Sequence, residues 1–218
     1  MGWVTGDTIA RDEQPAIVNM VRQDGSASQP LLRQLVGGDC RPRDLADAVH
    51  HLCTLHGRQP GLIDHAMGVT DWRDAQAWLA EAAEGFAAER AYLVRLAAAA
   101  GPSPSTPGQA ATEAALVAQR HAIDMLAQSV RPGCALGAAM ALALDWPAVR
   151  VPLDAMAERI GLDVPPLDLP PSIVTHDLIV AFTVDPAIGR AMTFGAQQLL
   201  AQHRGLWDLI GARIAARG

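Results

Sequence analysis

The residues best suited to chemistry are ionisable side chains that lie inside otherwise apolar helix stripes. Glu89 lies beside Phe86 on one such stripe, His203 lies in the middle of a second, and His56 continues a third. These positions follow from projecting each segment at about 100° per residue, the angular step of an α-helix. Burying an unpaired carboxylate or imidazolium costs several kcal/mol, so such residues are normally paired, neutral or metal-bound.

If the three stripes face one another, these side chains form one candidate site. Two imidazoles and one carboxylate suit a metal site for iron or another divalent metal, with His56, Glu89 and His203 as the ligands. The same groups suit hydrogen bonding to an organic ligand. No catalytic residue can be assigned. The predicted ligand-binding residues are Glu89, Arg90 as an anion partner, His203, His56, Cys134 and Trp146.

A purely structural interpretation stands beside this one. Glu89 and Arg90 would belong to ion pairs with other helices, and His203 would donate to a backbone carbonyl. His56 ends a helix, where an imidazolium gains from the helix dipole without any function. Cys134 would be a small buried hydrophobe. The sequence leaves the two interpretations open.

Other polar groups are interpreted as surface or capping residues. Asp47, His50 and His51 project away from the apolar stripe of their helix, which predicts a solvated edge. Glu113, Arg120 and Asp124 share one edge of a later helix, which is typical of a surface charge lattice. Asp145, which follows a strongly apolar run, is expected to cap a restarted turn, with Trp146 and Arg150 nearby at one end of the bundle.

Composition excludes several classes of function. A net charge of −6 and a pI near 5.6 argue against a general nucleic-acid-binding surface. All seventeen basic residues are Arg, which rules out chemistry that depends on lysine.

Three widely spaced cysteines without a CxxC suit a reducing compartment. The first residues lack a signal-peptide pattern. The longest apolar run has twelve residues, whereas about 18–20 span a bilayer. We expect a cytoplasmic protein without a membrane partner.

The elements that must position these residues are helices. Half of the residues are hydrophobic, aromatic residues are few and alanine is abundant, which favours helix over sheet. We predict one all-α domain over 1–218, with an irregular arm at 1–38 that contains short helical fragments at 14–22 and 30–36. An antiparallel bundle of about five to six long helices follows at 42–217, around a buried Ala/Gly-rich central helix. The expected helices are 42–56, 61–68, 72–100, 107–130, 133–160, 172–182 and a long one after Asp185-Pro186. Thr106 is expected to form a capping box before the fourth of these, and Pro147 and Pro152 to kink or restart the fifth. A strand at 178–184 is the alternative to the end of the sixth.

The order of these helices, with a buried Glu on one and a His on a distant one, resembles the ferritin-like and heme-oxygenase-like superfamilies over about residues 42–217. The resemblance implies a metal or organic ligand inside the bundle. For the heme-oxygenase-like members it implies His56 as a contact from an early helix. The Glu-x-x-His motif of ferritin-like di-iron proteins is absent, because Tyr92 occupies the third position after Glu89.

Two classes of function therefore compete. The leading hypothesis is a helical bundle that binds a small molecule or a metal in its interior, as a metal-dependent oxidoreductase-type enzyme. The alternative is a non-catalytic protein that dimerises or binds partners through its helix faces. A ligand-binding regulator is a third interpretation, which the lack of a basic helix-turn-helix weakens.

Overall fold

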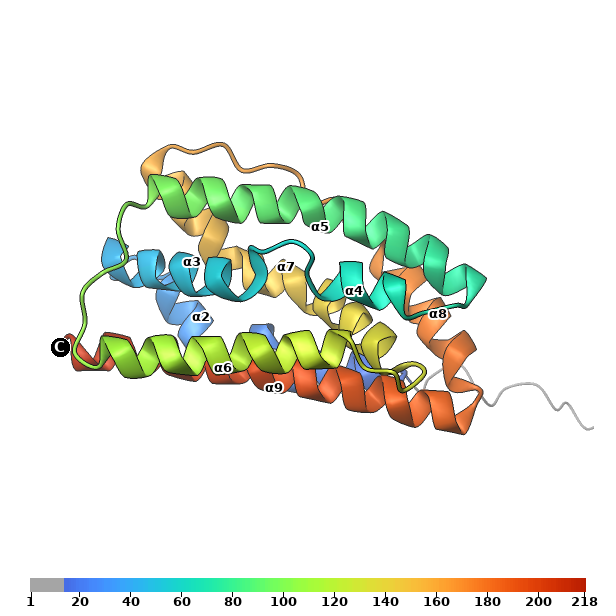
Figure 1. Ribbon diagram of the computed structural model, residues 1–218. Helices are drawn as coiled ribbons and strands as arrows, with labels where there is room; N and C mark the ends of the chain where they lie inside the picture. Colours follow the sequence, from blue (N-terminus) through green and yellow to red (C-terminus); the bar gives the residue numbers. More distant parts are fainter. Residues whose placement is uncertain (1–13) are drawn as a thin grey trace, which may run out of the picture.

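The computed structural model describes residues 14–218, and every regular element in this range is helical. The predicted all-α class is thus confirmed. The run 178–184, for which a strand was the alternative, lies almost wholly in a helix. The elements, labelled in Figure 1, are α1 (Ala16–Asp24), η1 (Ser26–Ser28), α2 (Pro30–Leu35), α3 (Pro42–His56), α4 (Leu62–Gly68), α5 (Arg73–Ala99), α6 (Gln109–Ala127), α7 (Cys134–Ile160), α8 (Ser172–Thr183) and α9 (Pro186–Ala216).

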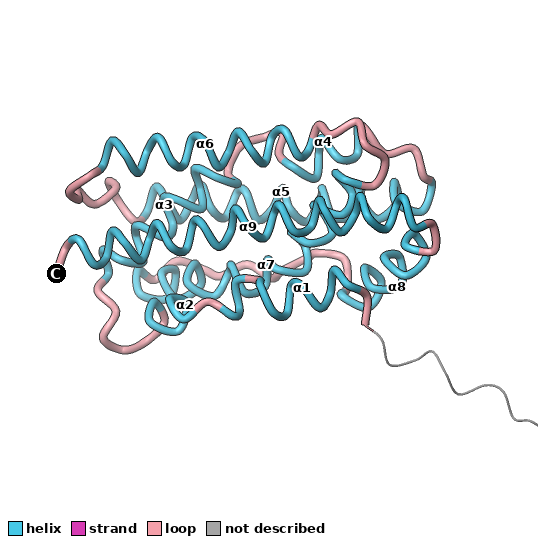
Figure 2. The backbone as a smooth tube through the Cα atoms, turned by 90° about the horizontal axis from the view of Figure 1, so that it is seen from below, coloured by secondary structure: helices cyan, strands magenta, loops and turns pink. Residues whose placement is uncertain are grey.

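The predicted N-terminal arm falls only partly within the described range, since residues 1–13 lie outside it. Its described part contains α1 and α2, which bury Ile17, Leu32 and Leu35 in the core. Both helices lie on the side of the molecule away from α6 (Figure 2). The arm therefore adds apolar surface to the core from residue 17 onward.

Helix α7 is the central element, and most of its residues are buried. Pro147 and Pro152 lie inside the helix, so the expectation that they restart it is wrong. By length and composition α7 could cross a membrane, although only its first part is a continuous apolar run. In its most apolar stretch of 18 residues, 78% is buried against the rest of the described chain. The core helix of a soluble protein shows the same burial.

Helices α7 and α9 run parallel, in contrast to the antiparallel arrangement expected for the bundle. A methyl group added at Gly137 would overlap the backbone of Met192, and one added at Gly195 would overlap the carbonyl of Cys134. Further along both helices, Asp145 contacts His203. The contact thus advances along both helices in the same direction. The glycines allow the two backbones to touch, and α8 with the segment before it returns the chain to the starting end.

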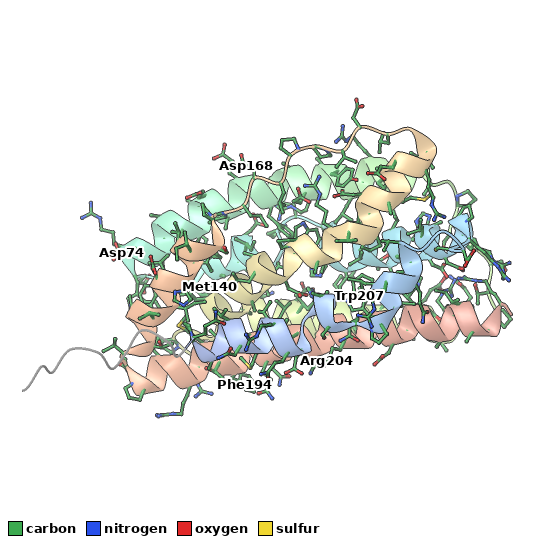
Figure 3. The ribbon with its side chains drawn as sticks, turned by 180° about the vertical axis from the view of Figure 1, so that it is seen from behind. Asp74, Met140, Asp168, Phe194, Arg204 and Trp207 are labelled. Atoms are coloured by element: carbon green, nitrogen blue, oxygen red, sulfur yellow. The ribbon has the colours of Figure 1, made fainter. Side chains whose placement is uncertain are left out.

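The segment between α7 and α8 is extended and lies along α5. Asp168 in this segment is labelled in Figure 3. Its carbonyl oxygen lies so close to Gly85 of α5 that an added methyl group would overlap it. Arg150 of α7 donates to the carbonyl of Pro165 in the same segment. The buried Arg150 and the close backbone approach at Gly85 therefore fix the path of the segment between α7 and α8.

Two of the predicted helix starts differ from the structure, and a third is confirmed. Helix α6 begins after Gly108 rather than after Thr106, whose buried hydroxyl instead accepts hydrogen bonds from Arg213 and Arg217. Helix α5 begins at Arg73, one residue after the predicted start at 72. Asp185 does cap α9, accepting from the backbone N–H groups of residues 187 and 188.

The edge of α3 that was expected to be solvated is covered by the end of α9. Asp47 is fully buried and accepts from Nε and Nη2 of Arg213, each at 3.0 Å, and also from Arg217. His51 is buried as well. The helical projection failed for this edge because it identifies only the most apolar face of a helix. A polar face can also be buried when a second helix supplies arginines that pair with its carboxylates.

Candidate functional site

Two of the predicted site histidines meet in the core. His56 at the end of α3 and His203 in the middle of α9 face each other, with their Nε2 atoms 3.0 Å apart. Nδ1 of His203 lies 2.7 Å from Oδ2 of Asp145 on α7. All three side chains are buried. Three helices that are distant in sequence thus contribute to one chain of hydrogen bonds.

Asp145 is held by the N-terminal part of the chain. The backbone N–H and the hydroxyl of Ser26 donate to its two oxygens at 2.7 and 2.6 Å. The indole of Trp207 in turn donates to the Ser26 hydroxyl at 2.9 Å. The expectation that Asp145 caps a restarted turn is wrong, because the helix continues. We call Ser26, Asp145, His203 and His56 the histidine relay.

The environment of the histidine relay sets its protonation. Burial alone would raise the pKa of Asp145, but the hydrogen bonds from His203 and Ser26 outweigh it and hold that pKa below its ordinary value. Burial, together with the neighbouring His203, holds the pKa of His56 well below its ordinary value. Asp145 is therefore ionised and His56 neutral at pH 7.

The hydrogen bonds then fix which nitrogens carry protons. An ionised Asp145 only accepts, so Nδ1 of His203 donates to it. When His203 is neutral, its Nε2 accepts, and Nε2 of His56 must donate. Nδ1 of His56 then carries a lone pair. The hydrogen bond that His56 forms within residues 14–218 uses Nε2, so Nδ1 is left to accept one from a bound molecule.

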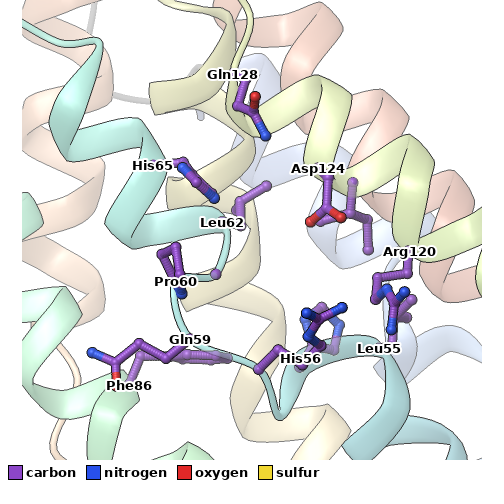
Figure 4. Close-up of a pocket in the computed structure, with 13 residues that line it drawn as sticks. Leu55, His56, Gln59, Pro60, Leu62, His65, Phe86, Arg120, Asp124 and Gln128 are labelled. Carbon is purple, nitrogen blue, oxygen red and sulfur yellow. The ribbon is translucent and has the colours of Figure 1, made fainter.

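A cavity of about 190 Å³ adjoins the histidine relay at His56. Its volume corresponds to about six water molecules. Figure 4 shows His65 of α4 on one wall and Arg120 and Asp124 of α6 on another. We call it the relay cavity. It is lined by Leu55, His56, Arg58, Gln59, Pro60, Gly61, Leu62, His65, Phe86, Arg120, Ile123, Asp124 and Gln128.

Glu89 belongs to a different network. Its carboxylate accepts from Nη1 of Arg150 and from the indole of Trp146, both at 2.8 Å. Arg150 also donates to Asp154, which accepts from the Tyr92 hydroxyl as well. Burial raises the pKa of Glu89, although Trp146 and Arg150 oppose the shift. This is the structural ion pair that the plainer interpretation describes.

Trp146 separates the two networks. Its ring centroid lies 5.5 Å from that of His56 and 4.6 Å from that of Phe86, both edge to face. Its N–H points to Glu89 rather than to a histidine. Because Asp145 and Trp146 are adjacent on α7, one helix turn orients both networks. Trp146 thus packs against His56 without a polar contact to it, and it is not among the residues that line the relay cavity.

The metal site implied by the sequence does not fit these residues. Both oxygens of Glu89 receive N–H donors, and Nδ1 of His203 is engaged by Asp145. In the described part of the chain, no group of three or more His, Cys, Asp or Glu residues is arranged to hold a metal ion. Two imidazoles alone are fewer than the three or more protein ligands typical of such sites. We therefore derive no chemistry from iron or another divalent metal.

The structure separates the two remaining predicted residues from the histidine relay. Arg90 forms a bidentate pair with Asp64 at 2.9 and 3.3 Å, and its guanidinium lies over Phe86. Cys134 is buried and borders another cavity, beside Met125 and Phe194. Neither contacts the relay, so the six predicted residues do not form one site.

Sequence reasoning missed Asp145, Ser26, Arg120 and Asp124. Asp145 is the first charge after twelve apolar or glycine residues, and that interruption was a usable signal. Ser26 offered none, because its role depends on where η1 docks. The edge formed by Arg120 and Asp124 did indicate a charged surface, but not that α4 faces it across a cavity.

Comparison with known proteins adds a family but no activity. Neither a search of curated proteins nor a search of solved structures finds a match. The ferritin-like and heme-oxygenase-like resemblance therefore stays a prediction. A family model described as "Family of unknown function (DUF6975)" matches residues 21–218, which include every residue of the histidine relay and the relay cavity. The chain belongs to this family, DUF6975.

Proposed function

We propose that the protein binds a small polar molecule in the relay cavity and exchanges a proton with it through His56. One observation carries the proposal: His56 lines the cavity and is hydrogen-bonded to a buried His203–Asp145 pair. A buried imidazole that only stabilised the fold would need no second histidine and no ionised carboxylate behind it. Burying that charge costs free energy, and titratable groups with perturbed pKa values cluster at functional sites.

The proposed step moves two protons. The bound molecule gives a proton to Nδ1 of His56, and the proton on Nε2 of His56 passes to Nε2 of His203. His56 ends neutral, and the positive charge resides on His203 beside the Asp145 carboxylate at 2.7 Å. A buried imidazolium is most stable next to an ionised partner. This arrangement explains how a histidine with a lowered pKa can still act as a base.

Asp145 and Ser26 are positioning residues in this scheme. Asp145 fixes the tautomer of His203, and Ser26 fixes the carboxylate of Asp145 through two hydrogen bonds. Trp207 in turn orients the Ser26 hydroxyl. None of them lines the relay cavity. Their effect on the bound molecule passes through His56 alone.

The experiment uses full-length protein labelled with ¹⁵N at histidine. The Nδ1 and Nε2 shifts report the tautomers of His56 and His203 while neutral, anionic and cationic molecules of three to six carbon and oxygen atoms are titrated to millimolar concentration. We expect at least one of them to shift Nδ1 of His56 saturably, both in wild type and in the exposed-histidine control His121→Gln. In His56→Gln the same molecule should leave His65, the remaining histidine of the cavity wall, unshifted. If none shifts Nδ1 of His56, the proposal is wrong.

A second candidate function is self-association through α6 and α9. Exposed apolar side chains lie side by side there: Met125 is 62% exposed and Phe194 44%, and both line one cavity. Phe194 also lines a second cavity. Such patches are typical of interaction sites. Analytical ultracentrifugation tests the homodimer, because a monomer at all concentrations would exclude it, and Phe194→Glu should abolish a dimer that forms here.

A further inference from the structure

The relay cavity carries charged groups that the protein itself leaves unused. Arg58 lies exposed at its rim, and Arg120 is half-buried in its α6 wall. Among the side-chain hydrogen bonds and ion pairs that residues 14–218 form, none involves either guanidinium. The arginines whose side chains are buried, Arg90, Arg150, Arg213 and Arg217, all pair with carboxylates. The two cavity arginines therefore have donors free for a ligand.

Asp124 adds a single negative charge to the same wall. It lies one turn beyond Arg120 on α6, at a spacing that normally allows an ion pair. The structure places no carboxylate oxygen of Asp124 within salt-bridge distance of Arg120, and the two line the cavity separately. A guanidinium and a carboxylate held apart on one wall can bind two different groups of the same molecule. His65 and Gln128 offer further hydrogen-bonding groups around them.

We infer that the relay cavity binds a small carboxylate that carries a hydroxyl or ammonium group near its carboxyl end. Arg120 and Arg58 receive the carboxylate, since guanidinium pairs with carboxylate through parallel N–H donors. Asp124 accepts from the hydroxyl or ammonium group. The volume of about 190 Å³ restricts the ligand to a few carbon atoms. This inference rests on the proposed function, because it names the ligand class of the cavity that His56 lines.

Isothermal titration calorimetry of the full-length protein tests the ligand class with four probes of similar size. L-lactate and L-alanine carry both groups, propionate lacks the donor and propane-1,2-diol lacks the carboxylate. We expect lactate or alanine to bind at least about tenfold more tightly than propionate, with no binding of the diol. Equal binding of lactate and the diol would overturn the inference while leaving the proposed function intact. If all four probes and the neutral and cationic molecules fail to bind, both are wrong.

Arg120→Gln gives the matched test of the residue. The side chain has no partner in the described chain, so the variant should fold with an unchanged thermal midpoint. We expect it to weaken the better of lactate and alanine at least about tenfold. Arg95→Gln, which removes the same charge from an exposed site on α5, should bind as wild type does. Equal affinity of both variants would show that Arg120 does not receive the carboxylate.

Discussion

Replacing Asp145 with Asn tests whether the histidine relay is held in place by a buried charge. The carboxylate accepts three hydrogen bonds, from the Ser26 N–H, the Ser26 hydroxyl and Nδ1 of His203. Asn has one acceptor oxygen and one N–H₂ group. In either orientation, its N–H₂ group faces at least one buried donor. An unsatisfied buried donor costs about 1–3 kcal/mol, and hydrogen bonds to a charged group contribute about 1.5–3 kcal/mol each.

We therefore expect Asp145→Asn to lower the free energy of unfolding by about 2–4 kcal/mol, because these contributions are not additive. Urea unfolding at pH 7, followed by circular dichroism, measures the change. Glu158→Gln, on an exposed position of the same helix, should stay within about 0.5 kcal/mol of wild type. The ¹⁵N spectrum should also show His203 losing its strict Nδ1–H tautomer. An unchanged stability together with an unchanged tautomer would refute the account of the relay.

Three further predictions concern the neighbouring networks and helix contacts. Glu89→Leu should lose about 3–5 kcal/mol of stability in urea unfolding, because it leaves the charge of Arg150 buried without its main partner. Gly195→Ala should lose about 1–3 kcal/mol in the same assay, because the added methyl group overlaps the carbonyl of Cys134. His56 has a lowered pKa in the folded state, so the unfolded chain binds its proton first. Its contribution to stability should be constant above about pH 6.5 and fall at lower pH, by at most about 1.4 kcal/mol per pH unit, and His56→Gln should remove this slope.

Matched variants make these three outcomes decisive. The double variant Glu89→Leu with Arg150→Met should recover much of the lost stability, since an apolar pair of similar size replaces the ion pair. Gly68→Ala, where nothing lies within 4 Å of the added methyl group, should be neutral or stabilising. If the free energy of unfolding falls with the same slope between pH 4.5 and 6.5 in wild type and in His56→Gln, the histidine is not buried as described.

Local signals in the sequence predicted the helices well. Proline at the first position and a final His before Gly57 mark α3, and its predicted bounds, 42–56, are those observed. Asp185-Pro186 marks the start of α9 equally well. These signals depend on backbone groups within one turn of the chain. The predicted capping role of Thr106 was wrong for a reason outside that range, because arginines at and just after the end of α9 use its hydroxyl.

The candidate site was predictable only in part. Burial of Glu89, His56 and His203 follows from the helix stripes and is confirmed. Which of them meet does not follow, because the stripe gives the direction of a side chain but not the identity of the facing helix. Helix α7 is apolar on nearly all sides, so its pattern gave no preferred face for Asp145. His203 pairs with Asp145 of α7, whereas Glu89 pairs with Arg150 and Trp146 in another network.

The parallel contact of α7 and α9 makes the geometry of the histidine relay depend on residues far from it. Asp145 lies eight residues beyond Gly137, and His203 lies eight residues beyond Gly195, which is about 12 Å along each helix. The two glycines thus set the register in which the carboxylate meets the imidazole, and a slip of one turn, about 5.4 Å, would break the contact. Selection for proton transfer would then act on positions that touch neither ligand nor relay. A deep mutational scan for activity should find Gly137 and Gly195 as intolerant as the histidines themselves.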